Sequence, residues 1–419
     1  MNKLFHNKKL LILGGNPETG ELVKTANQLG ITTLVVDPNP DSPAKKFAHK
    51  SYDVDGMDID GIVKIANIEQ VDGVLVGVAD ILVPSYAEVC QILNFPCYAS
   101  KATIEAFSSK DRFISICREH DIKTPKNFNI KDVKKNSSEF PLIVKPVDNG
   151  GGVGMIICHD YPSLLNGIEY SLSHSNSKNY IIEKYLECND LQVYYTIING
   201  EIFLSATNDR ILTKSTGKVP VCLGSEYPSS FTKIFLKKEN EKFKKLFQKI
   251  PIINGIISIQ LLFDGIDFYA YDPGFRLQGE GQHIHLNAIQ KYDHRKMLVQ
   301  FALTGCMFEG DFSKINDPFF SGKHSLTLWI LLNSGKISRV DGLQEIRSNP
   351  NVFDIMLRFQ VGDLVTQEMV GTERQVFARI YVVGDSRLEI KKVSKFIHEH
   401  LEIYDQHGDS MIVDRFYPE

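Results

Sequence analysis

The chain has 419 residues, of which 43% are hydrophobic and 23% charged, and its net charge is −4. This length exceeds that of one ordinary compact core, so we expect two or three domains. The composition excludes a disordered or fibrous protein. The slightly acidic balance gives no reason to expect nucleic acid or an anionic membrane as a partner, because both attract basic surfaces.

The first apolar run, from Leu10 to Leu13, stops at Gly14 and is too short for a signal peptide or a membrane helix. No later stretch reaches the roughly 18 apolar residues that a membrane span needs. The seven cysteines form no CxxC pair, which indicates reduced thiols. We therefore expect a cytoplasmic protein.

Residues 8–100 alternate short apolar strands with helical patterns, which predicts βαβ units and an α/β domain. The turn at 14–20 follows the first strand, where a dinucleotide fingerprint would lie, but its glycine spacing departs from G-x-G-x-x-G. A tight strand-to-helix turn is the preferred interpretation, and dinucleotide binding is the alternative. The expected strands are 9–13, 32–36 and 71–76, and the expected helices are 18–29 and 84–93.

Beyond this region the pattern predicts one amphipathic helix over 102–119, with Lys110 near its middle. Taken alone, such a lysine is a solvated surface charge. A small α/β lobe should follow, and then two mixed α+β segments, 191–310 and 320–400. The strands of the small lobe are expected at 142–145, 155–158 and 180–183, and its helix at 163–171. We therefore expect three domains, 1–105, 106–315 and 316–419, with the small lobe at about 124–187 inside the second.

The strand that ends in Lys145 is followed by a loop rich in glycine. Unobstructed backbone N–H groups and a nearby cation suit phosphate oxygens. The loop is not a Walker motif, which needs Lys and then Ser or Thr directly after its final glycine. A flexible hairpin between two strands is the alternative. The glycines of this loop are Gly150, Gly151, Gly152 and Gly154.

Another signal lies where the strand at 180–183 runs into a connector, with Asp190 close behind. Backbone groups of such a connector can pair with an adenine edge, while an acidic residue can accept from ribose hydroxyls. An ordinary edge strand explains these residues equally well.

An Asp-Gly pair marks a later hairpin turn. If Asp264 faces Phe268 across the turn, Gln260 also faces Asp272 on the same side of the hairpin. Two oxygen ligands directed at one point suit a divalent ion shared with phosphates. Arg276 follows and could neutralise charge on a transferring phosphoryl group. The alternative is a solvated hairpin with polar residues placed by chance.

In their order along the chain, these four signals resemble the ATP-grasp superfamily over nearly the whole sequence. The region 8–100 resembles the preceding substrate-side domain of that family. The tail from about 320 resembles the C-terminal lobe of members similar to biotin carboxylase and to amino-acid ligases. The resemblance implies an ATP-grasp fold, both α/β and α+β, with a Rossmann-like N-terminal domain and an α+β C-terminal lobe.

The resemblance also implies roles for individual residues. A divalent ion, Mg²⁺ or Mn²⁺, would be bound by Asp272 and Gln260. Lys145 and Arg276 would act at the phosphoryl-transfer centre, and Arg210 would grip a substrate carboxylate through two hydrogen bonds. A surface role for Arg210 is the alternative. ATP would be bound by Lys110, Lys145, Gly150, Gly151, Gly152, Gly154, Glu183, Lys184, Leu186 and Asp190.

The sequence departs from the family pattern at the metal ligands. Many members carry Glu where this chain has Gln260, although the halves of carbamoyl-phosphate synthetase are similar in tolerating Gln. Asp272 is shorter than the usual Glu, and Gly274 stands where an Asn ligand is usual. These departures put the second metal site in question.

The function that the resemblance implies is an ATP-dependent ligase. It would convert a carboxylate to an acyl phosphate for attack by an amine or ammonia, releasing ADP and phosphate. Phosphorylation of bicarbonate or carbamate and catalytically weak ATP binding are the alternatives. The expected partners are small carboxylates and amines, with no nucleic acid and no membrane. A homodimer is the assembly that related ligases often form.

Overall fold

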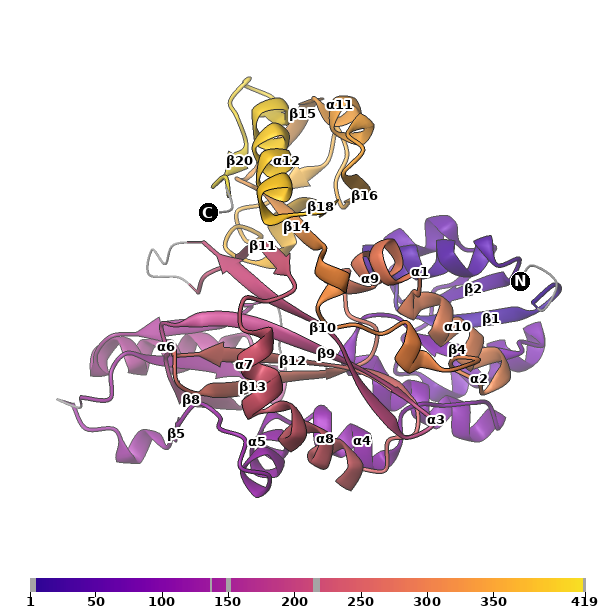
Figure 1. The fold of residues 1–419 in the computed structure, drawn as a ribbon, viewed down its shortest axis with the longest axis horizontal. Coiled ribbons are helices and arrows are strands. Elements are labelled where there is room, and N and C mark those ends of the chain that lie inside the picture. Colours follow the sequence, from indigo (N-terminus) through magenta and orange to yellow (C-terminus); the bar gives the residue numbers. More distant parts are fainter. Residues whose placement is uncertain (1–4, 136–137, 148–151, 214–218, 417–419) are drawn as a thin grey trace.

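The computed structural model describes residues 5–135, 138–147, 152–213 and 219–416 (Figure 1). The N-terminal domain is built on a four-stranded parallel sheet with the order β3-β2-β1-β4, which confirms the expected βαβ units. Its strands are β1 (Lys9–Leu13), β2 (Thr32–Val36), β3 (Lys50–Tyr52) and β4 (Gly73–Val76). Its helices are α1 (Pro17–Gln28), α2 (Ile59–Glu69) and α3 (Val83–Leu93).

Neighbouring side chains pack tightly against the turn at 14–20. A Cβ on Gly15 would lie 2.2 Å from Ser42 Oγ and 2.6 Å from Asp37 Cγ. Asn16 caps α1 by accepting a hydrogen bond from the Thr19 N–H. This packing favours the tight-turn interpretation over dinucleotide binding.

The single helix expected at 102–119 is wrong, because the chain forms α4 (Lys101–Phe107) and α5 (Lys110–Glu119) there. Ser109 has extended backbone angles, and its side chain accepts from the Arg112 N–H, so it caps a new helix. Serine competes with helical hydrogen bonds and favours such cap positions. Lys110 is therefore the first residue of α5, not a mid-helix residue.

The small lobe is an antiparallel sheet with the order β5-β8-β6-β7 and its own hydrophobic core. One helix, α6 (Tyr161–Ser173), packs on it. The core includes Leu142, Val144 and Leu164, all fully buried. The strands are β5 (Asn127–Phe128), β6 (Leu142–Pro146), β7 (Ile156–Cys158) and β8 (Tyr180–Lys184).

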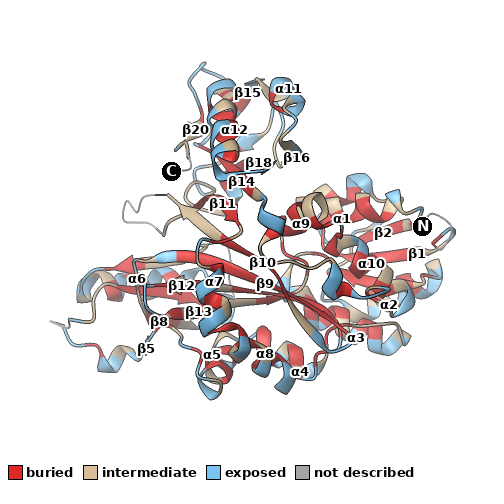
Figure 2. Cartoon of the chain, in the orientation of Figure 1, coloured by how far each residue is buried: buried red, intermediate tan, exposed pale blue. Residues whose placement is uncertain are grey.

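A nine-stranded sheet forms the centre of the molecule, in the order β13-β12-β9-β10-β11-β14-β18-β16 with β20 beside β14. Its first part comprises β9 (Asn189–Ile198), β10 (Glu201–Leu212), β11 (Cys222–Tyr227), β12 (Gly255–Phe263) and β13 (Phe268–Phe275). Four helices accompany these strands: α7 (Thr232–Lys238), α8 (Asn240–Lys249), α9 (Gln282–Gln290) and α10 (His294–Thr304). Figure 2 shows that most of β9 is buried.

The same sheet continues into the C-terminal lobe, across the domain boundary expected at 315/316. Its remaining strands are β14 (His324–Leu332), β16 (Val352–Leu357), β18 (Val376–Gly384) and β20 (Ile412–Val413). A smaller sheet contains β15 (Gly335–Asp341), β17 (Leu364–Val365) and β19 (Glu402–Asp405). The lobe's helices are α11 (Leu343–Ser348) and α12 (Arg387–His400). No helix in the described ranges has both the length and the hydrophobicity that crossing a bilayer requires.

A buried ion network joins the N-terminal domain to the other two parts. Arg379 of β18 donates to Glu18 of α1 at 2.7 Å and to the Gly279 carbonyl at 2.6 Å. Its guanidinium lies 4.4 Å from the centre of the Trp329 ring, and Arg358 is 3.7 Å from the same Glu18 oxygen. Burial favours neutral Glu18, yet the two arginines hold the pKa of Glu18 below its ordinary value. Removing one partner of this network would therefore leave an uncompensated buried charge at the contact between the domains.

Candidate active site

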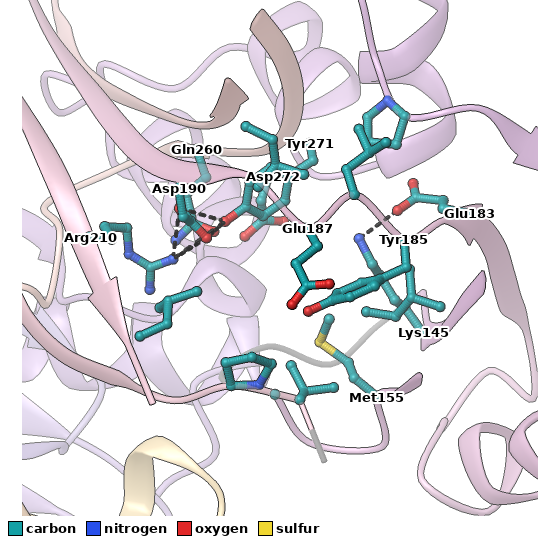
Figure 3. A pocket seen from close by; sticks show the side chains of 18 of the residues that line it. Lys145, Met155, Glu183, Tyr185, Glu187, Asp190, Arg210, Gln260, Tyr271 and Asp272 are labelled. Carbon is teal, nitrogen blue, oxygen red and sulfur yellow. Dashed lines mark hydrogen bonds and ion pairs between the residues drawn. The ribbon is translucent and has the colours of Figure 1, made fainter. Parts of the chain in front are cut away.

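A cavity of about 370 Å³ lies between the small lobe and the central sheet (Figure 3). This volume is within the range of roughly 300–1,000 Å³ that is typical of small-molecule sites. The connector 183–188 lines it from the small lobe, and strands β12 and β13 line it from the central sheet. Gly371 and Glu373 of the C-terminal lobe also reach it. The structure thus brings residues of all four sequence signals to one cavity, although Arg276 is not among the lining residues.

Lys145 and Glu183 form a buried ion pair beside the cavity. Lys145 Nζ is 2.5 Å from Glu183 Oε2, and the two side chains are 9% and 4% exposed. They lie on the adjacent strands β6 and β8, where Lys145 pairs in register with Ile181. The neighbouring charge of Glu183 holds the lysine ammonium at the cavity wall. Phosphate and adenine binding by this pair stays a prediction.

The connector places further groups at the cavity. Lys184 uses its ammonium to donate to the Glu139 and Phe140 carbonyls at 2.7 Å and 3.2 Å, which fixes the end of β8. Leu186 lines the cavity, as expected. Figure 3 shows Tyr185 and the exposed Glu187 directed into the cavity as well.

The glycine loop is described only in part. Gly150 and Gly151 lie outside the described residues. Gly152 has a φ of 82° and lines the cavity, and Gly154 has a φ of 74°. A Cβ on Gly154 would lie 2.6 Å from His174 Cβ and 2.7 Å from Pro146 Cγ, so this turn requires glycine.

The hairpin of β12 and β13 places Gln260 directly opposite Asp272, which confirms the predicted pairing. The expected pairing of Asp264 with Phe268 is wrong, since Phe263 pairs with Phe268 instead. Asp264 accepts hydrogen bonds from two N–H groups inside the turn, which makes the turn one residue longer. A bulge that leaves Tyr271 as the extra residue then restores the Gln260–Asp272 pair.

Lys110 and Asp272 approach each other across the cavity wall. Lys110 Nζ is 3.7 Å from Asp272 Oδ1, and the side chains are 21% and 44% exposed. As the first residue of α5, Lys110 is directed to this point by the Ser109 cap. A fixed cation therefore lies beside one of the two predicted metal ligands.

Arg210 is held between two buried carboxylates. Its guanidinium is 3.3 Å from Asp190 and 3.4 Å from Glu280, and it also donates to the Tyr271 hydroxyl. Burial raises the pKa of Asp190 and of Glu280, although Arg210 opposes the rise in both. Asp190 accepts from the Tyr271 hydroxyl as well. Ribose binding by Asp190 and carboxylate binding by Arg210 stay predictions, and both would require a rearrangement of this cluster.

Arg276 faces the N-terminal domain. It forms an ion pair with Asp80, and its Nη1 donates to the Leu277 carbonyl at 2.9 Å and to Gln278 Oε1 at 3.1 Å. No local pattern indicates the Asp80 contact, because Asp80 precedes Arg276 by 196 residues. The predicted catalytic role of Arg276 stays a prediction.

Comparisons of sequence find distant relatives. Residues 109–216 match the family model described as D-ala D-ala ligase C-terminus. The carbamoyl phosphate synthase large chain of Clostridium botulinum is 24% identical over 278 residues, which are 61% of this chain and 26% of that one. A formate-dependent phosphoribosylglycinamide formyltransferase of Prochlorococcus marinus is 27% identical over 190 residues, 43% of this chain and 48% of that one. The chain therefore spans only a quarter to a half of the length of these relatives.

Comparisons of structure cover nearly the whole chain. The L-amino acid ligase of Bacillus licheniformis matches with a TM-score of 0.75 at 18% identity, over 96% of this chain and 99% of that one. The biotin carboxylase of Campylobacter jejuni matches with a TM-score of 0.72 at 16% identity, over 96% of this chain and 92% of that one. The chain has the ATP-grasp fold. The predicted fold class is thereby confirmed.

Within the ATP-grasp fold, two histidines near the start of α9 are buried. His285 has no exposed surface, and its Nε2 is 2.7 Å from Thr327 Oγ1. Burial lowers the pKa of His285 to about 3. His283 is buried too, and burial lowers its pKa. Both side chains are buried packing residues of α9.

We expect the buried His285 to make the ATP-grasp fold sensitive to acid. In the folded protein the His285 ring is neutral at pH 7, while a histidine in the unfolded chain has a pKa near 6.5. Stability is therefore present above pH 6.5 and is lost as the pH falls toward the folded-state pKa of about 3. The free energy of unfolding of a His285→Gln variant should fall less steeply from pH 6.5 to 4, by about 1.4 kcal/mol per pH unit. Urea denaturation across this pH range measures the slope for each protein. Equal slopes in the wild-type chain and the variant would contradict the lowered pKa of His285.

Proposed function

We propose that this ATP-grasp chain is an ATP-dependent ligase that joins a carboxylate to an amine or to ammonia. The observation that carries the proposal is the arrangement of charges around one cavity. Lys145 and Lys110 supply cations at its walls, and Gln260 and Asp272 present two oxygen ligands from one hairpin. This combination suits a nucleoside triphosphate and a divalent ion.

The proposed chemistry begins with the carboxylate, which is a poor acyl donor because its oxygen is a poor leaving group. Attack of the carboxylate oxygen on the γ-phosphorus of ATP forms an acyl phosphate and releases ADP. The amine then attacks the acyl carbon, phosphate leaves, and the amine loses a proton. Lys145 and Lys110 would hold the phosphates in position and offset their charge, and positioning with electrostatic stabilisation accounts for most of such catalysis.

The residues present fit ATP and one divalent ion. Backbone groups of the connector 183–188 would receive the adenine, and the oxygens of Asp272 and Gln260 would bind the ion. When bound, the ion would supply charge neutralisation on the phosphates. Relatives of the same fold support this choice, since N5-carboxyaminoimidazole synthetase of Staphylococcus aureus was crystallised with ADP and a Hydrogenobacter carboxylase domain with MgADP.

The test is a panel of carboxylates and amines incubated with the protein and Mg²⁺-ATP. We expect ADP and phosphate to form only when both a carboxylate and an amine are present, together with a product whose mass equals their sum less one water. AMP formation would contradict an acyl-phosphate route. Binding of ATP without turnover across the panel would favour the catalytically weak alternative.

Phosphorylation of bicarbonate is a second candidate, because the large chains of carbamoyl phosphate synthase are among the relatives. Omitting added carboxylates and supplying bicarbonate alone separates the two. ADP release that depends on bicarbonate, and not on any organic acid, would favour this candidate. A small carboxylate, an amine and ATP are the proposed partners in the first case.

A further inference from the structure

The protein donors at the proposed metal site are few. Gln260 and Asp272 face each other in the hairpin and line the cavity. Over the described ranges, no three His, Cys, Asp or Glu side chains gather in a way that could hold a metal ion. Mg²⁺ often takes one or two protein ligands and completes its shell with phosphates and water. This donor set fits an ion that arrives with the nucleotide.

The third ligand position of the hairpin carries no ligand side chain. Gly274 occupies it and pairs with Ser258 across the two strands. A Cβ on Gly274 would lie only 2.5 Å from Gln278 Nε2 and 3.2 Å from Ser258 Oγ. The amide end of Gln278 therefore lies in the space beside Gly274, and a side chain at 274 would have to displace it.

The Gln278 amide is also turned the wrong way to replace that ligand. Its Oε1 accepts a hydrogen bond from Arg276 Nη1 at 3.1 Å, which leaves the NH₂ end toward Gly274. An amide NH₂ group only donates hydrogen bonds and does not bind cations. Position 274 and its neighbour together supply no oxygen ligand.

A cation already stands beside the one carboxylate of the site. Lys110 Nζ is 3.7 Å from Asp272 Oδ1, and its side chain is 21% exposed. With Gln260 neutral, the charge of Asp272 is offset by Lys110 before any ion binds. A second divalent ion at the same carboxylate would be repelled by the first ion and by Lys110.

We infer that this site binds a single divalent ion together with the nucleotide, and that Lys110 supplies the positive charge that a second ion would otherwise bring. The inference rests on the proposed ATP binding, because the ion is expected to enter with the phosphates. It makes the missing oxygen ligands at positions 260 and 274 the limit on the number of ions. A carboxylate at 260 would give the hairpin two opposed anionic ligands.

The experiment counts ions on the full chain. Mn²⁺ and a non-hydrolysable ATP analogue are added to saturation, and free Mn²⁺ is measured by electron paramagnetic resonance while bound nucleotide is measured by filtration. We expect one Mn²⁺ per bound nucleotide in the wild-type chain and two in Gln260→Glu. Gln248→Glu makes the same chemical change at an exposed position of α8 and should stay at one.

A second variant tests position 274 independently. Gly274→Asn combined with Gln278→Ala removes the obstructing amide and supplies the missing oxygen, so it should also raise the count to two. Two ions per nucleotide in the wild-type chain would overturn the inference, and so would one ion in both designed variants. Failure of the analogue to bind at all would overturn the proposed ATP binding as well, and the nucleotide measurement alone reveals that case.

Discussion

Lys145→Met is expected to lower kcat by about 100- to 1,000-fold, as removal of one preorganised electrostatic stabiliser commonly does. The lysine ammonium is held at the cavity wall by its ion pair with Glu183. Methionine keeps the length and the apolar stem of the side chain but removes its charge. The measurement is ADP release under saturating ATP with the substrates found in the panel.

The variant leaves Glu183 buried without its cation, so a stability control is needed. Glu183→Gln in the Lys145→Met background removes the unpaired carboxylate and should restore thermal stability without restoring turnover. Recovery of turnover in this double variant would show that Lys145 serves only to neutralise Glu183. Wild-type turnover in Lys145→Met would show that the active site has been placed wrongly.

Arg379→Met should lower the free energy of unfolding by about 3–5 kcal/mol, the cost of breaking a buried ion pair on one side. Arg379 is 2% exposed, and its loss leaves the Gly279 carbonyl without its donor and Glu18 with only the more distant Arg358. Chemical denaturation followed by tryptophan fluorescence suits this change, because the single Trp329 lies against Arg379.

Lys323→Met provides the matched control in the same lobe. Lys323 pairs with Asp385 at 2.9 Å, but the two side chains are 49% and 82% exposed. Such surface pairs contribute at most about 1 kcal/mol, so the control should unfold near the wild-type midpoint. Equal losses in both variants would argue against a special role for the buried network.

Local patterns predicted three strands of the N-terminal sheet, because β1, β2 and β4 are continuous apolar runs bounded by turns, and they missed the polar strand β3. β1 and β2 have the predicted bounds, and α1 differs by one residue at each end. The prediction of a single helix at 102–119 was wrong for an equally local reason, since two serines in succession end one helix and cap the next. The continuation of the central sheet beyond residue 315 depends on long-range pairing of β11 with β14, which no local pattern encodes.

The site was predicted in outline but not in its ion pairing. The order of motifs located Lys145, Asp190 and the hairpin, and the structure places them at one cavity. The cluster in which Arg210 bridges Asp190 and Glu280 was missed, because it joins residues from β9, β10 and the loop after β13. Tyr271 was missed since a β-bulge has no distinct sequence signature here.

The continuity of the central sheet determines which parts can move as rigid bodies. Strands β12 and β13 carry Gln260 and Asp272, and hydrogen bonds link them strand by strand to β14, β18 and β16 of the C-terminal lobe. A rotation of that lobe would have to bend the whole sheet. The small lobe, by contrast, has its own sheet and its own core, so it can hinge while the sheet stays still. Gln260 and Asp272 thus belong to the central sheet, which stays in place, and Lys145 and Glu183 belong to the small lobe, which can hinge.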